Sequence, residues 1–545
     1  MATEAPGVPA GPVQGAAQRA ERLDTKAAGV VTVAVLCSRV LGLIRDLVTA
    51  ALFGGGGLMD AFTAAFRIPN LLRDLFAEGA LSTAFVTTFS KTVARGGEAA
   101  AWRLANKVAT LTAVVLTGIC IVGIVFSPQL VAGIAPYFPP AKAALTVTLT
   151  RIMFPFILMV SLAALVMGML NSRNVFGVPA IASSFFNIGS ITGGVLFGYW
   201  LDPHFGARAL VGLAIGTLLG GAMQLGVQLP RLVRLGYRFR PDFHWRDPGI
   251  NAILALMGPS VIAASTTQVN VLINSVFASG LGNGPIFWLS IAFRLVQLPL
   301  GLFGVALGTV TLPLLSRLVV AGNLGAFRAE LSRGMRLAFL LTLPATVGLM
   351  MLAGPIISVL YQHGRFTAAE AAQAAGALRF YAVGLCGYAA LKVLVNAFYA
   401  LDRRKTPMMV SFMAVALNLL FNWLFTFRLG WGVRGLAFST GCVATCNFLV
   451  LYALMRRQLT RLETRRMLMM LLKVATACAA LALVCGASVH GWLGQWQHER
   501  FLLRSGELLA TVIAGGLAFV GAGLALRIEE LQELAAIVRR RLTAD

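Results

Sequence analysis

Charged residues are scarce in this chain. Only 12% of its 545 residues are Asp, Glu, Lys or Arg, whereas 58% are hydrophobic and the mean hydropathy is +0.80. Soluble proteins average about 25% charged residues. The composition therefore excludes an ordinary soluble domain and indicates an integral membrane protein. In such a protein the net charge of +24 reports on loop topology, and we expect no nucleic-acid partner.

Motifs for catalysis and metal binding are also absent. The sequence has no Walker A motif, no nucleophile elbow and no zinc motif, and its five His residues show no ligand spacing. The seven Cys residues lie almost entirely in apolar stretches and form no disulfide framework. We therefore expect neither an enzyme nor a resident metal or cofactor. The N-terminus shows no apolar core with a cleavage site, so no signal peptide is expected.

Long apolar stretches are what the chain has instead. A helix needs about 20 mainly apolar residues to cross the hydrocarbon core of a membrane. Fourteen stretches meet this requirement, and they predict an all-α polytopic membrane protein. They are 27–53, 59–92, 101–136, 143–171, 178–201, 207–232, 249–279, 285–318, 332–361, 370–401, 406–427, 433–456, 466–490 and 503–527.

The basic residues predict the topology. With the N-terminus inside, 29 of the 45 Lys and Arg residues fall in inside segments and 7 in outside segments. This asymmetry follows the positive-inside rule. We expect a multi-pass membrane protein with both termini cytoplasmic.

A weak internal repeat organises these spans. Ala65-Phe66-Arg67 and Ala292-Phe293-Arg294 lie 227 residues apart, and the same offset pairs Leu71 with Leu298. Six spans separate the copies, so two six-helix lobes related by a parallel pseudo-two-fold axis are predicted. The predicted parts are a disordered cytoplasmic tail (1–26), an N-terminal lobe (27–236), a C-terminal lobe (249–459), a two-helix appendage (464–530) and a cytoplasmic tail (531–545).

Residues 37–78 carry charges inside two predicted spans. One charge at a helix centre costs roughly 3 kcal/mol, so such residues need a cavity, a partner or a function. At 100° per residue, the polar groups of each span share one face. These groups are Ser38, Arg39, Arg45 and Asp46 in the first span and Arg67, Asn70, Asp74 and Glu78 in the second, with Arg73 beside the second stripe.

The second lobe has a shorter polar stripe made of Ser290, Arg294 and Gln297. No Asp or Glu lies in the interior of the predicted spans between residues 250 and 450, since Glu370 stands at the very start of the span 370–401. Guanidinium geometry suits a bidentate grip on phosphate, so Arg294 is a candidate for binding an anion. The alternative for all these charges is a structural ion-pair network, such as Arg39 with Asp46 or Arg67 with Asp74.

Two interpretations are open for Asp60, near the predicted outer end of the second span. It is either an outer gate residue or an ordinary acid at a helix N-terminus. Four glycines, 54–57, precede it. They favour a hinge over a phosphate cradle because no Walker lysine follows.

The sequence resembles the MurJ (MviN) family of lipid II flippases, within the multidrug/oligosaccharidyl-lipid/polysaccharide exporter superfamily. The resemblance runs from about residue 27 to the end of the last span. The matching pieces are Ser38-Arg39-Val40-Leu41-Gly42, Arg45-Asp46, Asp60-Ala61-Phe62, Pro69-Asn70-Leu71-Leu72-Arg73, Phe76-Ala77-Glu78-Gly79-Ala80, Leu170-Asn171, Pro299, Gly304-Val305-Ala306-Leu307-Gly308-Thr309, Gly364-Arg365-Phe366-Thr367 and Lys405-Thr406-Pro407.

The resemblance implies that the chain moves undecaprenyl-diphosphate-linked muropeptide, lipid II, from the inner to the outer leaflet of the bacterial cytoplasmic (inner) membrane. It implies two lobes around a cationic cavity, with the appendage forming a groove for the lipid tail. The family's functional arginines fall on Arg39, Arg45, Arg73 and Arg294, and its outer aspartate falls on Asp60. Ser38, Asp46, Arg67, Asn70, Asp74, Glu78 and Gln297 are expected to support or gate the site.

Two departures from the family pattern surround Arg294. Some members have an Asp-Arg pair where this chain has Phe293-Arg294, and a Glu where it has Gln297. Both changes remove negative charge from beside Arg294. They weaken the hypothesis of a proton relay at this position and leave the anion-binding role of Arg294 intact.

The expected mechanism is alternating access between the lobes, with the membrane potential acting on the cavity cations. Sodium or proton coupling stays open, with Asn418 and Asn422 as hints of a cation site. Lipid II and membrane lipids are the expected partners, together with cell-wall synthesis proteins. The rivals are a flippase for another polyprenyl-diphosphate-linked oligosaccharide and a non-transporting scaffold of the cell-wall machinery. A drug exporter is disfavoured because its cavity would be acidic.

Overall fold

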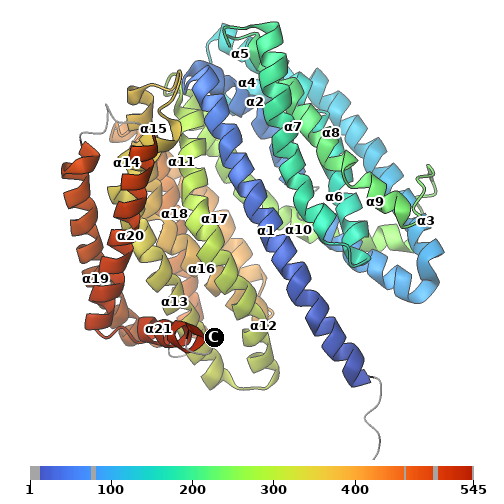
Figure 1. The fold of residues 1–545 in the computed structure, drawn as a ribbon. Helices are drawn as coiled ribbons and strands as arrows, with labels where there is room; N and C mark the ends of the chain where they lie inside the picture. Colours follow the sequence, from blue (N-terminus) through green and yellow to red (C-terminus); the bar gives the residue numbers. More distant parts are fainter. Residues whose placement is uncertain (1–12, 75–80, 460–461, 495–500, 543–545) are drawn as a thin grey trace, which may run out of the picture. The chain divides into compact units, whose positions relative to one another are not determined.

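Helices make up every regular element in the part of the chain that the computed structural model describes, residues 13–74, 81–459, 462–494 and 501–542 (Figure 1). This confirms the predicted all-α class. Glu78, one of the predicted supporting residues, lies outside the described residues.

The first half of the chain forms ten α-helices. They are α1 (Val13–Phe53), α2 (Gly57–Arg73), α3 (Ser82–Val125), α4 (Ser127–Ile134), α5 (Pro140–Met153), α6 (Phe156–Ser172), α7 (Gly177–Leu201), α8 (Ala209–Gly226), α9 (Leu229–Arg234) and α10 (Pro248–Ser279).

The second half continues with α-helices and three short η segments. They are α11 (Pro285–Pro299), η2 (Leu300–Val305), α12 (Ala306–Val320), α13 (Leu324–Met351), α14 (Ala353–Tyr361), α15 (Ala368–Val383), α16 (Leu385–Ala400), α17 (Lys405–Trp423), η3 (Leu424–Arg428), α18 (Val433–Leu459), α19 (Thr464–His490), η4 (Trp492–Gly494), α20 (Phe501–Ala525) and α21 (Glu529–Leu542).

Eleven helices within the described residues are long and apolar enough to cross a membrane. They correspond to eleven of the fourteen predicted spans. The other three predictions fall on α1, on α2 with the start of α3, and on α10. Charged residues within α1 and α2 explain part of the difference, since the predicted span on α1 carries Arg39, Arg45 and Asp46. A count of fourteen therefore stays a prediction.

Helix α1 corrects the predicted disordered tail, because it begins at Val13, well inside residues 1–26. The segment around Ala16-Ala17 is rich in Ala, Gln, Arg and Glu, which have high helix propensity. A segment that is too polar to span a membrane can therefore still form a helix.

Several predicted spans are interrupted or joined differently. The predicted stretch 59–92 falls on α2, which is described to Arg73, and on the start of α3, described from Ser82, while residues 75–80 lie outside the described part of the chain. Helix α3 bends inside the predicted loop at 93–100, where Gly97 is non-helical at φ +73° and separates two helical stretches, so the predicted boundary between the second and third spans is confirmed. The predicted stretch 143–171 breaks between α5 and α6, just before Phe156, where Pro155 cannot continue the hydrogen-bond ladder.

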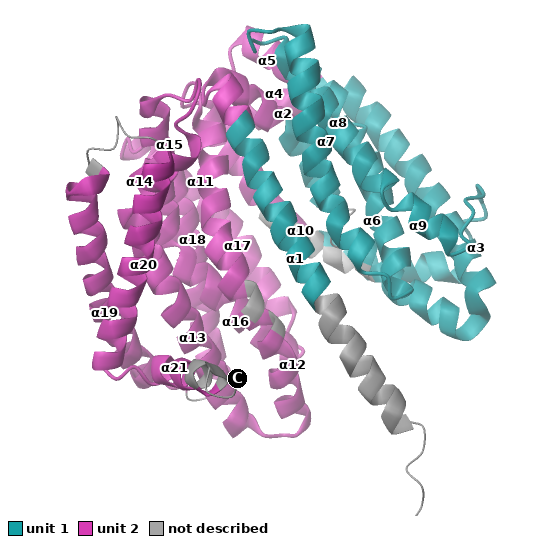
Figure 2. Cartoon of the chain, viewed as in Figure 1, with its two compact units in different colours: residues 1–48, 66–127, 148–262 teal, residues 49–65, 128–147, 263–545 magenta. Residues whose placement is uncertain are grey.

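Contacts divide the chain into two units (Figure 2). Unit 1 holds residues 1–48, 66–127 and 148–262, and unit 2 holds 49–65, 128–147 and 263–545. Segments 49–65 and 128–147 belong to the predicted N-terminal lobe in sequence, yet their contacts are with unit 2. These units are defined by contacts between residues and not by the internal repeat, so the two six-helix lobes stay a prediction.

Helices α7 and α8 of unit 1 pack at backbone distance. Gly212 and Gly216 of α8 lie against the backbone of Gly198 and Gly194 of α7, and a Cβ atom on either α8 glycine would collide with that backbone. Small residues permit this close approach in membrane helices. Beside this pair, an apolar core around Phe85 anchors α3 to α6.

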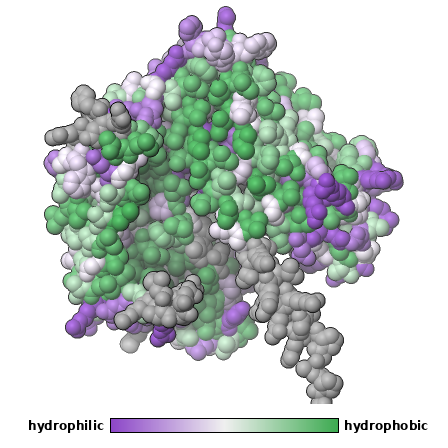
Figure 3. Space-filling view, in the orientation of Figure 1, coloured by the Kyte–Doolittle hydropathy of each residue, from purple (hydrophilic) through white to green (hydrophobic). Residues whose placement is uncertain are grey.

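Large apolar side chains are exposed on the surface. Trp200 and Val320 are 80% and 89% exposed, and hydrophobic residues cover much of the face in Figure 3. A soluble monomer rarely exposes such large continuous apolar patches. The surface therefore agrees with a lipid environment.

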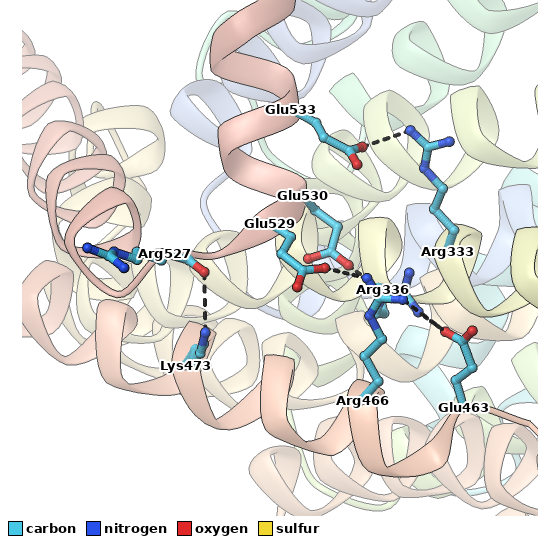
Figure 4. A network of polar contacts seen from close by, with 9 residues as sticks. All are labelled: Arg333, Arg336, Glu463, Arg466, Lys473, Arg527, Glu529, Glu530 and Glu533. Atoms are coloured by element: carbon cyan, nitrogen blue, oxygen red, sulfur yellow. Dashed lines mark hydrogen bonds and ion pairs between the residues drawn. The ribbon is translucent and has the colours of Figure 1, made fainter.

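The C-terminal segment 531–545, predicted as a tail, includes most of a docked helix. Helix α21 is held by ion pairs to the first half of α13 and to the start of α19 (Figure 4). We call this set of residues the C-terminal clamp: Arg333, Arg336, Glu463, Arg466, Glu529, Glu530 and Glu533.

Arg336 is the buried centre of the C-terminal clamp. Its side chain is 6% exposed and pairs with Glu530, also 6% exposed, and with Glu463 at 2.7 Å. Arg333 pairs with Glu533 at 2.7 Å near the surface. A hydrogen bond from Arg466 lowers the pKa of Glu529. Ion pairs thus attach helix α21, and the pattern of apolar residues in the sequence does not predict these pairs.

Candidate functional site

Two Arg–Asp pairs lie on the charged faces of unit 1. The Arg45 guanidinium is 3.2 Å from the Asp46 carboxylate on α1, and both side chains are largely buried. The Arg45 Cζ atom also lies 5.5 Å from the centre of the Phe186 ring on α7. The aspartate and the ring hold the guanidinium against α7, which restricts its rotamers.

The second pair joins Arg73 to Asp74 at the end of α2. Their side chains are 2.9 Å apart, and Asn70 donates a hydrogen bond of 3.5 Å to the same carboxylate. The supporting role predicted for Asn70 and Asp74 stays a prediction. Both of these ion pairs join sequence neighbours, and the pairs weighed from sequence alone, Arg39 with Asp46 or Arg67 with Asp74, also stay a prediction.

Ser38 and Arg39 occupy different environments on α1. Asn187 of α7 donates a hydrogen bond of 3.1 Å to the Ser38 carbonyl oxygen, so Ser38 is part of the α1–α7 contact. Arg39 is exposed, and Arg67 on α2 is half-buried. Arg39 therefore has room to meet a ligand, while Ser38 acts through its backbone.

In unit 2 the predicted stripe of α11 lies on the accessible side of the helix. Ser290 and Arg294 are half-buried and Gln297 is exposed, whereas the intervening Ile291 and Leu295 are buried. Arg39, Arg45 and Arg73 belong to unit 1 and Arg294 to unit 2. Their meeting in one cavity stays a prediction.

Asp60 caps the N-terminus of a helix other than its own. It lies in the first turn of α2 and is fully buried. Its carboxylate accepts hydrogen bonds from the backbone N–H groups of Gly284, at 2.6 Å, and Phe287, at 3.0 Å, at the start of α11. The α11 N-cap residue, Gly284, has no side chain to fill this role. Asp60 therefore lies in the first turn of α2, as one of the two sequence interpretations expects, and its carboxylate also caps α11, while a gate role stays a prediction.

A lysine from a third helix completes this site. Lys142 of α5 lies 2.9 Å from the Asp60 carboxylate and donates to the Asn283 side chain at 3.2 Å. Its ammonium group also lies 4.0 Å from the centre of the Phe138 ring. We call Asp60, Lys142, Asn283, Gly284 and Phe287 the Asp60 cluster. One buried carboxylate thus joins α2, α5 and α11.

The glycine run before Asp60 is a packed turn. Gly54 has φ +77°, and a Cβ atom on Gly55 or Gly57 would lie 2.5 Å from Phe366 or 2.8 Å from Asn283. The Arg365 N–H donates to the Ala51 carbonyl oxygen at 2.9 Å. The glycines therefore permit close packing against the loop before α15. A phosphate cradle is not what this packing provides.

Sequence analysis missed Lys142 and Asn283 as site residues. In the sequence, Lys142 is one of the 7 basic residues in predicted outside segments, and no motif includes Asn283. The family resemblance includes Gly364-Arg365-Phe366-Thr367 in the loop before α15, but it does not predict that this loop contacts Ala51. No local pattern connects Asp60 to Lys142, which lies 82 residues away.

The predicted hint of a cation site, Asn418 and Asn422 on α17, belongs to a buried amide network. Asn422 is fully buried and donates to the side-chain oxygens of Asn274, at 2.7 Å, and Asn418, at 3.1 Å. Its own oxygen accepts a hydrogen bond from Ser439. The network joins α10, α17 and α18. Coupling to a cation stays untested, and the visible role of these amides is to fasten three helices.

We expect Asn422→Ala to lower the free energy of unfolding by about 2–3 kcal/mol, because the buried Asn418 and Ser439 and the half-buried Asn274 each lose a hydrogen bond. Thermal unfolding of the purified protein in detergent measures this loss. Asn447→Ala on α18 is the matched control, since the Asn447 side-chain oxygen is buried without a hydrogen-bond partner in the described residues. Equal stability losses in the two variants would contradict the assignment.

Comparison with known proteins identifies the family. The family model described as "Lipid II flippase MurJ" matches residues 49–506. The "Probable lipid II flippase MurJ" of Vibrio cholerae is 36% identical over 461 residues, covering 83% of this chain and 86% of that protein. The "Lipid II flippase MurJ" of Burkholderia cenocepacia is 36% identical over 429 residues, covering 78% of this chain and 82% of that protein.

Solved structures share the fold. "Lipid II flippase MurJ, inward closed conformation" matches with a TM-score of 0.74 and 23% identity, covering 93% of this chain and 99% of that chain. An inward-facing MATE transporter of the MOP superfamily matches with a TM-score of 0.65 and 14% identity, covering 78% of this chain and 94% of that chain. The shared fold and the long apolar helices together define a polytopic helical membrane protein.

The sequence relatives narrow this class further. The chain belongs to the MurJ family, the lipid II flippases. The family is one of transporters and not of enzymes.

Proposed function

We propose that this protein flips lipid II across the bacterial cytoplasmic membrane by alternating access. The observation that carries the proposal is its membership of the MurJ family over residues 49–506. The peptidoglycan precursor would enter with its head group from the cytoplasmic side and leave on the outer side. Both termini would then be cytoplasmic, as the distribution of Lys and Arg favours.

The substrate diphosphate would bind to Arg39, Arg45, Arg73 and Arg294. Guanidinium groups bind phosphate oxygens in pairs and stay charged in a membrane cavity. Asp46 and Asp74 would hold Arg45 and Arg73 in position, because each aspartate already pairs with its neighbouring arginine. Asn70 would orient Asp74, and Gln297 would present an uncharged polar group beside Arg294.

The Asp60 cluster would close the outer end of the transport path. Residues 49–65 and 128–147 pack with the start of α11 in unit 2 through this cluster. Outward opening would require Asp60 to release the two N–H groups of α11. The membrane potential would contribute to the cycle, at roughly 2.3 kcal/mol per charge per 100 mV.

Reconstitution tests the function directly. Purified protein in vesicles with fluorescent lipid II is expected to move label between leaflets, measured by quenching from outside. An unrelated polyprenyl-diphosphate sugar and empty vesicles are the controls. Equal transport of both lipids would identify a less selective oligosaccharide flippase, and no transport of either would favour a scaffold.

The driving force is tested in the same vesicles. A potassium diffusion potential and a sodium gradient, applied separately, distinguish the membrane potential from sodium coupling as the driving force.

We expect Arg294→Ala to slow flipping roughly 10–100-fold, because a charge-assisted hydrogen bond contributes about 1.5–3 kcal/mol. Arg294→Lys is expected to recover only part of the rate, since it loses the bidentate geometry. The rate of leaflet exchange in vesicles measures both variants. Arg317→Ala removes an exposed arginine of α12 and serves as the control. Wild-type exchange by Arg294→Ala would remove Arg294 from the proposed site.

A further inference from the structure

A cavity lies in unit 2, on elements outside the charged helix faces described above, and its mostly small, apolar lining includes the polar side chains of Ser358, Gln362 and Arg504. It has a volume of about 290 Å³ and lies among α14, α15, α20 and the end of α19 with η4. These are the ends of the helices that adjoin predicted outside loops. The cavity is therefore predicted to lie at the outer surface of the membrane.

The space exists because α15 has only small side chains where it faces the cavity. Ala368, Ala371 and Ala375 line it, together with Gly354 of α14. Ala368 is exposed, whereas Ala371 and Ala375 are buried, so the cavity extends from the surface toward the interior. The volume suits a small group better than a sugar–peptide head group.

Arg504 supplies a cation to this cavity. It lies in the second turn of α20 and lines the cavity together with Ser358 and Gln362. Its Nε atom is buried and has no hydrogen-bond partner in the described part of the chain. Burying a guanidinium N–H without an acceptor is costly, so the arrangement calls for an anionic ligand.

The neighbouring polar groups agree with this chemistry. Ser358 donates its hydroxyl hydrogen to the Gln362 side-chain oxygen, which leaves the Gln362 amide group as a donor. Glu507 lies one turn further along α20 and is not among the residues that line the cavity. The lining thus presents donors and a positive charge.

The surroundings indicate that the ligand is a lipid. Phe501, Leu502 and Leu503, immediately before Arg504, are exposed apolar residues, and Trp492 of η4 is exposed and donates a hydrogen bond to Thr511 of α20. Tryptophan and basic residues next to exposed apolar residues are typical of the membrane–water interface. A soluble anion would not require this apolar surface.

We propose that this cavity binds the phosphate of an anionic phospholipid head group from the outer leaflet, with Arg504 as its principal contact. The phosphate accepts hydrogen bonds from the Arg504 guanidinium and the Gln362 amide, and the acyl chains follow the exposed apolar surface of α20. The proposal depends on the membrane placement of α20 and not on which lipid the protein transports. A bound lipid at this position would connect α20 to α14 and α15.

Native mass spectrometry of the purified full-length protein tests the proposal, with phosphatidylglycerol as the probe. Arg504→Ala is expected to weaken the binding of one phosphatidylglycerol about tenfold, the effect of losing one charge-assisted hydrogen bond. Ala372→Phe places a large side chain at the exposed edge of the cavity and is expected to cause the same loss with the fold intact. Arg428→Ala, an exposed arginine at another predicted outer end, is expected to change nothing.

Three further arms identify the source of the phosphate. Diacylglycerol, which lacks phosphate, is expected to bind equally to wild type and Arg504→Ala. Millimolar inorganic phosphate is expected to leave phosphatidylglycerol bound, and its displacement would overturn the lipid assignment in favour of a soluble anion. Stronger Arg504-dependent binding of undecaprenyl phosphate would overturn the phospholipid assignment. Equal losses from Arg504→Ala and Arg428→Ala, or full binding by Ala372→Phe, would overturn the site itself.

Discussion

Asp60→Ala is expected to reduce flipping by roughly 100-fold or more while the protein still inserts and folds. The substitution removes the acceptor of two backbone N–H groups and the partner of Lys142. Removing one partner from a buried charge pair costs about 3–5 kcal/mol, because the other charge stays buried and unpaired. In a two-state cycle, that amount corresponds to a population change of at least roughly 100-fold.

Two measurements separate this role from a general loss of stability. Leaflet exchange in vesicles gives the rate, and hydrogen exchange of the peptide that contains Gly284 and Phe287 reports on the α11 N-terminus. Both amides are expected to exchange faster in Asp60→Ala. Asp60→Asn keeps an acceptor oxygen but loses the charge, so an intermediate effect is expected.

The matched control is Asp202→Ala. Asp202 also accepts hydrogen bonds from two backbone N–H groups, those of His204 and Gly206, in a predicted outside loop. Its acceptor role is local, so flipping is expected to continue at the wild-type rate. Wild-type transport by Asp60→Ala, or equal loss in the two variants, would refute a closing role for the Asp60 cluster.

Arg336→Ala is expected to destabilise the protein by about 3–5 kcal/mol, because Glu530 stays buried without its partner. The expected consequence is release of α21 from α13 and α19. Thermal unfolding in detergent measures the stability, and limited proteolysis of the C-terminus measures the release. Cleavage is expected to fall between Ala525 and Glu529, where α20 ends and α21 begins.

Arg333→Ala provides the control within the same helix. Arg333 is 47% exposed and its partner Glu533 is 54% exposed. An exposed ion pair contributes about 0–1 kcal/mol, so little change is expected. The double variant Arg336→Met with Glu530→Leu is expected to recover much of the stability, since apolar residues often replace buried ion pairs without loss. A failure of α21 to detach in Arg336→Ala would show that apolar contacts alone hold it.

Some features follow from the sequence because they depend on residue type alone. Each apolar stretch identifies a membrane span through the cost of leaving its residues in water. Charges within α1, α2 and α11 are conspicuous for the opposite reason, since their cost in lipid is high. The all-helical class, the membrane environment and the candidate residues Arg45, Arg73 and Arg294 were predictable in this way.

Other features depend on which segments meet in space. Asp60 contacts Lys142 and Gly284, which are 82 and 224 residues away in the chain. Arg336 contacts Glu530 at a separation of 194 residues. No periodicity links such positions, because hydrophobic patterns select a helix face without specifying the partner on that face.

The sequence by itself determined that this protein is a helical membrane transporter with costly charges on three of its helices. Only the tertiary structure decided that Asp60 caps α11, that the predicted C-terminal tail includes the docked helix α21, and that Arg504 lines a cavity. The physical reason is that transfer energies are properties of single residues, whereas a hydrogen bond or an ion pair requires two groups within about 3 Å of each other.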